Sequence, residues 1–176
     1  MNQWAHGLHG DARRESSKLR NRTPAELEAK FLKLQSGNYN HASDATPRYN
    51  CLAFVNGDHR HLWEAGKNGG RYHWPKGISD TLDGWTEIFT REGYELTDNR
   101  EIEPGFEKVA IYIDLGDLLP GHVAMSDGRV WKSKLGRLQD IEHSSLDLLE
   151  GDQNWEYGIV ERILRRRIKH KKQAES

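Results

Sequence analysis

The run Lys108-Val109-Ala110-Ile111-Tyr112-Ile113 decides the fold, because it is almost continuously apolar and rich in residues that favour strands. Such a run predicts a strand buried on both faces near the centre of a sheet. Residues 122–125 and 129–132 flank Ser126-Asp127-Gly128, which is a hairpin signal. Alternating apolar residues over 157–168 predict a final strand. We therefore expect an antiparallel sheet in the second half of the chain.

Helical patterns lie mostly in the first half. Thr23-Pro24-Ala25-Glu26 predicts a helix start, with Thr23 as N-cap, Pro24 at the first position and Glu26 closing a capping box. A second helix is expected after Ser79 or Asp80, with Gly93 just beyond its end. A short helix is expected near residues 146–149. Helices first and sheet second predict an α+β fold, with N-terminal helices packed on an antiparallel sheet.

The 176 residues predict one domain over residues 23–168, with a flexible polar arm at 1–22 and a basic tail at 169–176. Residues 38–50 are expected to be irregular. Residues 56–77 resemble a loop whose aromatic side chains pack back onto the domain.

Composition excludes several classes of protein. The formal net charge is −1, which makes binding to nucleic acid unlikely. No apolar run is long enough to span a bilayer, and no secretory signal is visible at the N-terminus. We expect a cytoplasmic protein, or one delivered by a specialised secretion route, and no membrane partner.

Cys51 is the single cysteine, and it follows a turn at Thr46-Pro47 and opens the apolar stretch Leu52-Ala53-Phe54-Val55. A thiol in the first turn of a helix is favoured as a thiolate. His122 begins a strand later in the chain. A helix-borne thiol and a strand-borne imidazole are the parts of a cysteine nucleophile and its base.

The motifs Tyr49-Asn50-Cys51-Leu52-Ala53-Phe54 and residues 121–128, which begin Gly121-His122-Val123, resemble those of NlpC-type papain-like cysteine peptidases. The resemblance implies a papain-like core and a cysteine-dependent hydrolase or acyl transferase (peptidase, amidase or deamidase). The chain departs from the family's motif after the cysteine, where Leu52-Ala53 replaces the usual Ser-Gly.

The chain is also similar to an uncharacterised bacterial domain family, over roughly residues 45–165. The shared motifs are Tyr-Asn-Cys-x-Ala followed by an aromatic residue, residues 131–136 (Trp-Lys-Ser-Lys-Leu-Gly) and Ile141-Glu142-His143. This family brings little functional knowledge with it.

The resemblance assigns roles to further residues. His143 or, more weakly, Ser133 would orient the imidazole of His122, as the third member of a triad. The backbone N–H of Cys51 would stabilise the oxyanion, assisted by Tyr49 or Asn50, and Trp131 would contact substrate. The substrate would be a peptide or another amide-containing molecule, and no cofactor or metal is expected.

Two alternatives remain open. His59, His61 and His73, together with Cys51 or His122, would make a mixed zinc site, although their spacing fits no standard finger. The second alternative is a non-catalytic binding module, toxin- or phage-related, with a protein partner. Its support is a basic run near the end of the chain, formed by Arg162, Arg165, Arg166, Arg167, Lys169, Lys171 and Lys172.

Overall fold

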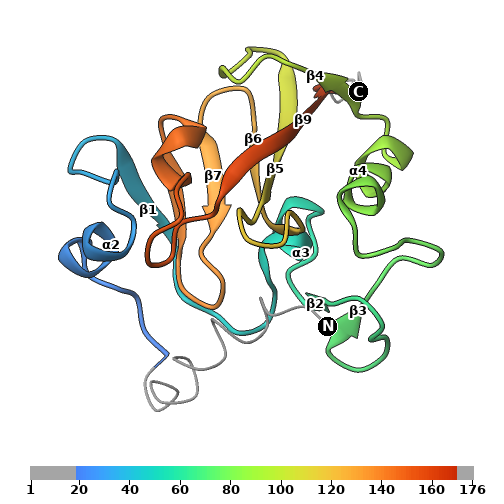
Figure 1. Ribbon diagram of the computed structural model, residues 1–176, viewed down its shortest axis with the longest axis horizontal. Helices are drawn as coiled ribbons and strands as arrows, with labels where there is room; N and C mark the ends of the chain where they lie inside the picture. Colours follow the sequence, from blue (N-terminus) through green and yellow to red (C-terminus); the bar gives the residue numbers. More distant parts are fainter. Residues whose placement is uncertain (1–18, 170–176) are drawn as a thin grey trace, which may run out of the picture.

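The computed structural model describes residues 19–169, which form a seven-stranded antiparallel sheet with helices along it (Figure 1). The strand order is β1-β8-β7-β6-β5-β9-β4. A separate pair, β2 and β3, is parallel. The strands are β1 Tyr39–Ser43, β2 Leu62–Trp63, β3 Tyr72–His73, β4 Glu95–Thr97, β5 Phe106–Ile113, β6 Pro120–Ser126, β7 Trp131–Lys134, β8 Asp140–His143 and β9 Ile159–Arg167. The helices are α2 Pro24–Lys30, α3 Cys51–Val55, α4 Leu82–Arg91 and the 3₁₀ helix η1 Leu146–Leu149.

Strand β5 lies inside the sheet, as its apolar run predicts. It pairs with β6 on one side and β9 on the other. Val109, Ala110, Ile111 and Tyr112 are completely buried. Their alternate side chains therefore serve two cores, one on each face of the sheet.

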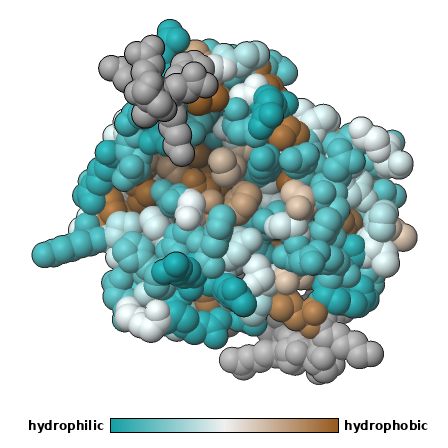
Figure 2. Space-filling model, turned by 180° about the vertical axis from the view of Figure 1, so that it is seen from behind, coloured by the Kyte–Doolittle hydropathy of each residue, from teal (hydrophilic) through white to brown (hydrophobic). Residues whose placement is uncertain are grey.

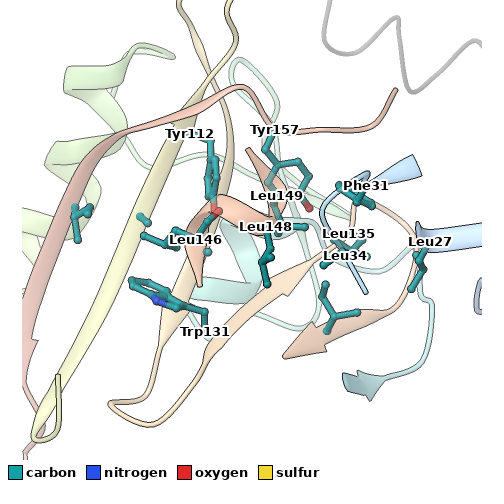
Figure 3. Close-up of a cluster of buried hydrophobic side chains, with 14 residues drawn as sticks. Leu27, Phe31, Leu34, Tyr112, Trp131, Leu135, Leu146, Leu148, Leu149 and Tyr157 are labelled. Atoms are coloured by element: carbon teal, nitrogen blue, oxygen red, sulfur yellow. The ribbon is translucent and has the colours of Figure 1, made fainter. Parts of the chain in front are cut away.

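The first core contains side chains from α2, η1 and one face of the sheet, with Trp131, Tyr112 and Tyr157 among its largest members (Figure 3). The second core contains α3, α4 and the other face, including Cys51, Trp85 and Val123. The division follows the strand period of two, because Ala110 and Tyr112 face the first core while Val109 and Ile111 face the second.

The predicted helix starts form close to their local signals. Thr23 and Glu26 make the capping box of α2, with Pro24 at its first turn. The cap of α4 is Thr81, one residue after the predicted Asp80, and Gly93 follows its end with a φ of 86°. The predicted turn at 126–128 does join β6 to β7.

The expected papain-like α+β core is wrong. The molecule is mainly an antiparallel sheet, and its α-helices are short, with 7, 5 and 10 residues in α2, α3 and α4. The order of elements also differs, because β1 lies ahead of α3 in the chain and pairs with β8 at one edge of the sheet. Helices therefore do not form an N-terminal layer of their own.

Five strands form where the sequence pattern predicts none. Strand β1 lies in the segment 38–50, which was expected to be irregular, and the others are β2, β3, β4 and β8. The side chains of β1 and β4 are mostly exposed, so they carry no apolar alternation. Residues 56–77 contain the short β2 and β3, and Trp74 is buried in the second core as expected for this loop.

The surface seen from behind is mostly hydrophilic, with limited hydrophobic areas (Figure 2). This agrees with a mean hydropathy of −0.88. Within residues 19–169 no helix is long and apolar enough to cross a membrane.

Most of the predicted arm, and the tail beyond Lys169, lie outside the described residues. In the described part of the arm, Arg20 forms an ion pair with Glu26. The backbone N–H and C=O of Arg22 each form a hydrogen bond with the side-chain amide of Gln139. Residues 20–22 are thus tied to the domain.

Candidate functional site

Cys51 is the first residue of α3, and its position is set by Asn50. The Asn50 side chain accepts a hydrogen bond from the N–H of Ala53, which is the usual arrangement of an N-cap. Asn50 also donates to the carbonyl of Trp63 at 2.9 Å, which ties the start of α3 to β2. Asn50 therefore has a structural role at the start of α3.

The thiol of Cys51 lies against β6. Its sulfur is 3.9 Å from the carbonyl oxygen of Gly121, the residue before His122. Strand β6 pairs with β7 only through Met125 and Ser126, so the thiol meets the β6 backbone beyond the end of that pairing. The structure thus brings Cys51 next to the strand that carries His122.

Polar groups surround the sulfur although it is buried. The backbone N–H groups of Val123, Leu52 and Cys51 itself, together with the ammonium of Lys134, favour the thiolate. Burial is the larger effect, and it raises the pKa of the thiol. The lowered thiol pKa expected for a resting thiolate is therefore not found.

The imidazole ring of His122 contacts a residue of the first core, Tyr157. Its imidazole stacks on Tyr157 with ring centroids 3.8 Å apart and planes 2° from parallel. Val123, the next residue, packs with Cys51 in the second core, because side chains alternate along β6. Burial lowers the pKa of His122 to about 4. The pairing of Cys51 with His122 stays a prediction.

His143 and Ser133 form a buried pair. Ser133 Oγ lies 2.9 Å from His143 Nε2, and His143 Nδ1 lies 2.9 Å from the carbonyl oxygen of Ser145. A carbonyl can only accept, so Nδ1 carries the proton and Nε2 accepts from the serine hydroxyl. Burial lowers the pKa of His143 to about 4. Trp131, beside them in β7, is only 1% exposed and packs in the first core.

Tyr49 lies at the border between this buried region and solvent. Its hydroxyl donates to Asp140 Oδ2 at 3.3 Å. Its ring stacks on Phe54 and contacts the exposed His59, with centroids 6.2 and 5.0 Å away.

The buried pair Lys134 and Asp140 is the most unusual polar group on β7 and β8, and the sequence pattern did not predict it. The Lys134 side chain is fully buried and donates to the carbonyl of Leu138. Its Nζ lies 4.0 Å from Asp140 Oδ1 and 5.3 Å from the centre of the Tyr49 ring. Asp140 accepts from Ser43 and Tyr49 through Oδ2, whereas its buried Oδ1 has no hydrogen-bond partner.

The pKa values of this pair move toward the neutral forms. Burial lowers the pKa of Lys134 to about 8, against the opposing charges of Asp140 and Cys51. Burial also raises the pKa of Asp140, although Ser43 and Lys134 oppose this. Lys134 is visible in the sequence as part of the motif Trp-Lys-Ser-Lys. Its burial is not, because that depends on β8 and on Tyr49, which lie in other segments of the chain.

Of the three histidines of the zinc alternative, His61 and His73 lie near each other, with ring centroids 6.4 Å apart, whereas His59 packs elsewhere. His61 Nδ1 binds Asp58 at 2.9 Å, His59 packs on Tyr49, and His73 packs on Trp63 with centroids 4.7 Å apart. Within the described part of the chain, no group of three histidine, cysteine or acidic residues could hold a metal ion.

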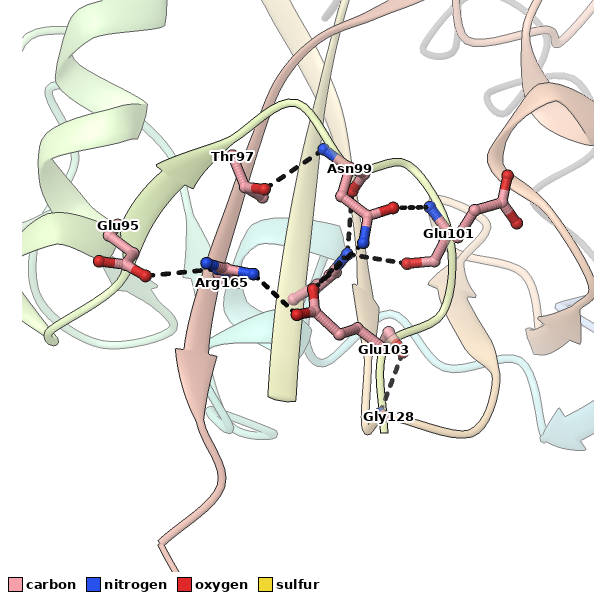
Figure 4. A network of polar contacts seen from close by, with 9 residues as sticks. Glu95, Thr97, Asn99, Glu101, Glu103, Gly128 and Arg165 are labelled. Atoms are coloured by element: carbon pink, nitrogen blue, oxygen red, sulfur yellow. Dashed lines mark hydrogen bonds and ion pairs between the residues drawn. The ribbon is translucent and has the colours of Figure 1, made fainter. Parts of the chain in front are cut away.

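Three arginines of the basic run, Arg162, Arg165 and Arg166, form ion pairs with carboxylates. Arg165 binds Glu103 at 2.7 Å and Glu95 at 3.3 Å (Figure 4). Arg162 pairs with Asp83, and Arg166 pairs with Glu107. These arginines belong to β9 and link it to its neighbours, so within residues 162–167 the run is part of the sheet.

Neither the comparison with curated proteins nor that with solved structures found a match. A family model did match, over residues 40–165, which include every strand except the ends of β1 and β9 and all the residues around Cys51. This confirms the expectation of an uncharacterised domain family, while nothing supports the papain-like resemblance. The chain belongs to the family described as "Domain of unknown function (DUF7689)".

Proposed function

We propose that the protein is a thiol-dependent hydrolase or acyl transferase whose nucleophile is Cys51. The observation that carries the proposal is the polar surrounding of a sulfur that lies in an otherwise apolar core. Three backbone N–H groups and one buried ammonium favour negative charge at that atom. A cysteine that only fills space needs none of these groups.

The chemistry that fits this arrangement is attack on a carbonyl carbon. The Cys51 sulfur bonds to the carbon of an amide, ester or thioester, and the thiol proton passes to a base. The backbone N–H groups of Cys51, Leu52 and Val123 favour the thiolate before attack. As the S–C bond forms, the negative charge moves to the carbonyl oxygen, where the N–H of Cys51 would stabilise it. The protonated base returns its proton to the leaving amine, alcohol or thiol, whose release leaves an acyl-enzyme that water or a second acceptor then cleaves.

Substrates of this class would be peptides or other amide-containing molecules. Tyr49 and His59 border the buried Lys134–Asp140 pair on the solvent side. An acyl group would approach Cys51 along this border.

The test is a comparison of acylation in the folded and the unfolded chain. p-Nitrophenyl acetate at pH 7.5 should acetylate Cys51 in the native protein at least tenfold faster than in the same protein in concentrated urea. Intact-mass and peptide mass spectrometry locate the acetyl group, and Cys51→Ala is the control for labelling at other residues. Burial alone would make the native thiol slower than the unfolded one, and that result would remove the proposed nucleophile.

A further inference from the structure

Two of the three histidines of the zinc alternative lie on one face of the β2–β3 pair. Trp63 and His73 are partners in the parallel register, so their side chains lie on the same face. His61 precedes Trp63 by two residues and therefore shares that face. The ring centroids of His61 and His73 are 6.4 Å apart, and that of Trp63 is 4.7 Å from His73. The fold thus brings together two imidazoles from separate segments.

Asp58 fixes the ring of His61 in one tautomer. Its carboxylate accepts hydrogen bonds from Trp63 Nε1 at 2.8 Å, from the backbone N–H of Arg60 at 2.9 Å and from His61 Nδ1 at 2.9 Å. Although burial opposes them, these bonds lower the pKa of Asp58 to about 2. A carboxylate can only accept, so His61 Nδ1 carries the proton and Nε2 of the neutral ring keeps its lone pair.

Both imidazoles keep ring nitrogens for a ligand. Within residues 19–169, His61 Nε2 makes no hydrogen bond, and neither does a ring nitrogen of His73. The side chain of His61 is 39% exposed and His73 is half-buried, so a small solute reaches both. A lone pair on each ring is therefore available from solvent.

The arrangement has two features of a histidine metal site. A metal-bound histidine usually donates its second ring N–H to a carboxylate, as His61 does to Asp58. With metal–nitrogen bonds of about 2.0 Å, two imidazoles on one tetrahedral ion have ring centroids about 5 Å apart. The rings of His61 and His73 need to approach each other by only about 1–2 Å to reach this geometry. Rotation of the His73 side chain supplies that movement, because ring packing and no hydrogen bond holds its imidazole among the described residues.

We propose that His61 and His73 bind a divalent transition-metal ion of the zinc type, with Asp58 as the residue that positions the His61 ring. Each imidazole supplies one nitrogen, and water or a further ligand takes the remaining positions on the ion. Imidazole nitrogen suits Zn²⁺, Cu²⁺ and Ni²⁺, whereas Mg²⁺ and Ca²⁺ prefer oxygen. The site needs neither the thiol of Cys51 nor the imidazole of His122, so it is independent of the proposed function.

The experiment is isothermal titration calorimetry of the full chain with ZnCl₂ at pH 7.5. His61→Gln and His73→Gln should each weaken zinc binding by about tenfold or more, and Asp58→Asn by about tenfold. His41→Gln is the matched control, because His41 also pairs with a carboxylate, Asp44 at 3.1 Å, and is similarly exposed. Among the described residues His41 has no ring contact with a second histidine, so this variant should bind zinc like the unmodified protein.

Three other results would overturn the assignment. The absence of zinc binding by the unmodified protein would remove the site. Zinc binding that neither His61→Gln nor His73→Gln weakens would place the ion elsewhere, and its loss in a His6→Gln, His9→Gln double variant would assign it to those residues. Loss of zinc binding in Cys51→Ala would assign it to the thiol. Circular dichroism checks that each variant is folded, and the exposed His61 carries the test if His73→Gln is not.

Discussion

Gly158 illustrates how one residue without a side chain permits a close approach of two segments. It precedes β9, has a φ of 78°, and exchanges two backbone hydrogen bonds with Gly151. A Cβ at this position would lie 1.9 Å from the carbonyl oxygen of Ile113, at the end of β5. Both the positive φ and the contact with backbone require glycine here.

Gly158→Ala should lower the free energy of unfolding by more than about 3 kcal/mol, because the backbone of Ile113 must move. Gly105→Ala is the matched control. Gly105 also has a positive φ, 85°, but open space around its would-be Cβ, so only the strain of about 1–2 kcal/mol applies. Urea unfolding at pH 7.5 measures both, and equal losses would contradict the steric argument.

At the scale of an element, α3 depends on groups outside itself. A helix of five residues is too short to be stable alone. Its N-cap, Asn50, links it to β2 through both the N–H and the carbonyl of Trp63. The helix also packs against β6 and β7, which brings Cys51 to the backbone of Gly121.

Asn50→Ala should reduce the free energy of unfolding by about 2 kcal/mol, through loss of the cap and of the Trp63 contacts. Asn50→Asp keeps an acceptor for the N–H groups of Ala53 and Trp63 but loses the donor to the Trp63 carbonyl, and about 1 kcal/mol is expected. Thermal and urea unfolding measure both changes. An alanine variant as stable as the unmodified protein would show that the cap does not hold α3.

At the scale of the whole molecule, strands distant in the chain complete the sheet. β9, near the end of the described residues, lies between β5 and β4 rather than at an edge. β1, near the beginning of the described residues, pairs with β8 and forms one edge of the sheet, while β4 forms the other. The two cores on the faces of this sheet enclose two imidazoles, His122 and His143, both almost completely buried.

These imidazoles predict a loss of stability in mild acid. Their folded pKa is about 4, below the value of about 6.5 in an unfolded chain, so the unfolded chain binds protons first as the pH falls. Their contribution is fully present above about pH 6.5 and is lost between about 6.5 and 4, by up to about 3 kcal/mol for each residue. Urea unfolding at pH 7.5, 6 and 5 should show this decline, and constant stability over that range would contradict buried neutral histidines.

The sequence predicted those helices, strands and turns whose signals lie within the element itself. The capping box of α2 and the turn at 126–128 each act within four residues. The strands β5, β6 and β9 were predicted because apolar side chains mark them. The edge strands β1 and β4 were not, because most of their side chains are exposed and their strand form comes from hydrogen bonds to β8 and β9.

Some features of the candidate site were likewise predictable from neighbouring residues in the chain, and others depend on the fold. The position of Cys51 at a helix start followed from the turn at Thr46-Pro47 and the apolar residues after the cysteine, which are neighbours in the chain. The burial of Lys134 beside Asp140 and Tyr49 did not follow, because these residues come from three separate segments. The face on which His122 lies was likewise settled by the register of β6 and its stacking on Tyr157.

The sequence by itself determined where helices and turns begin, that β5 is central, and that a single thiol opens α3. Those features depend on side chains within one or two turns of each other. The tertiary structure alone decided the strand order, the edge strands, and the buried amine and carboxylate on β7 and β8. Pairing and burial are properties of segments far apart in the chain, and the pKa values of buried groups follow from the neighbours that the fold assembles.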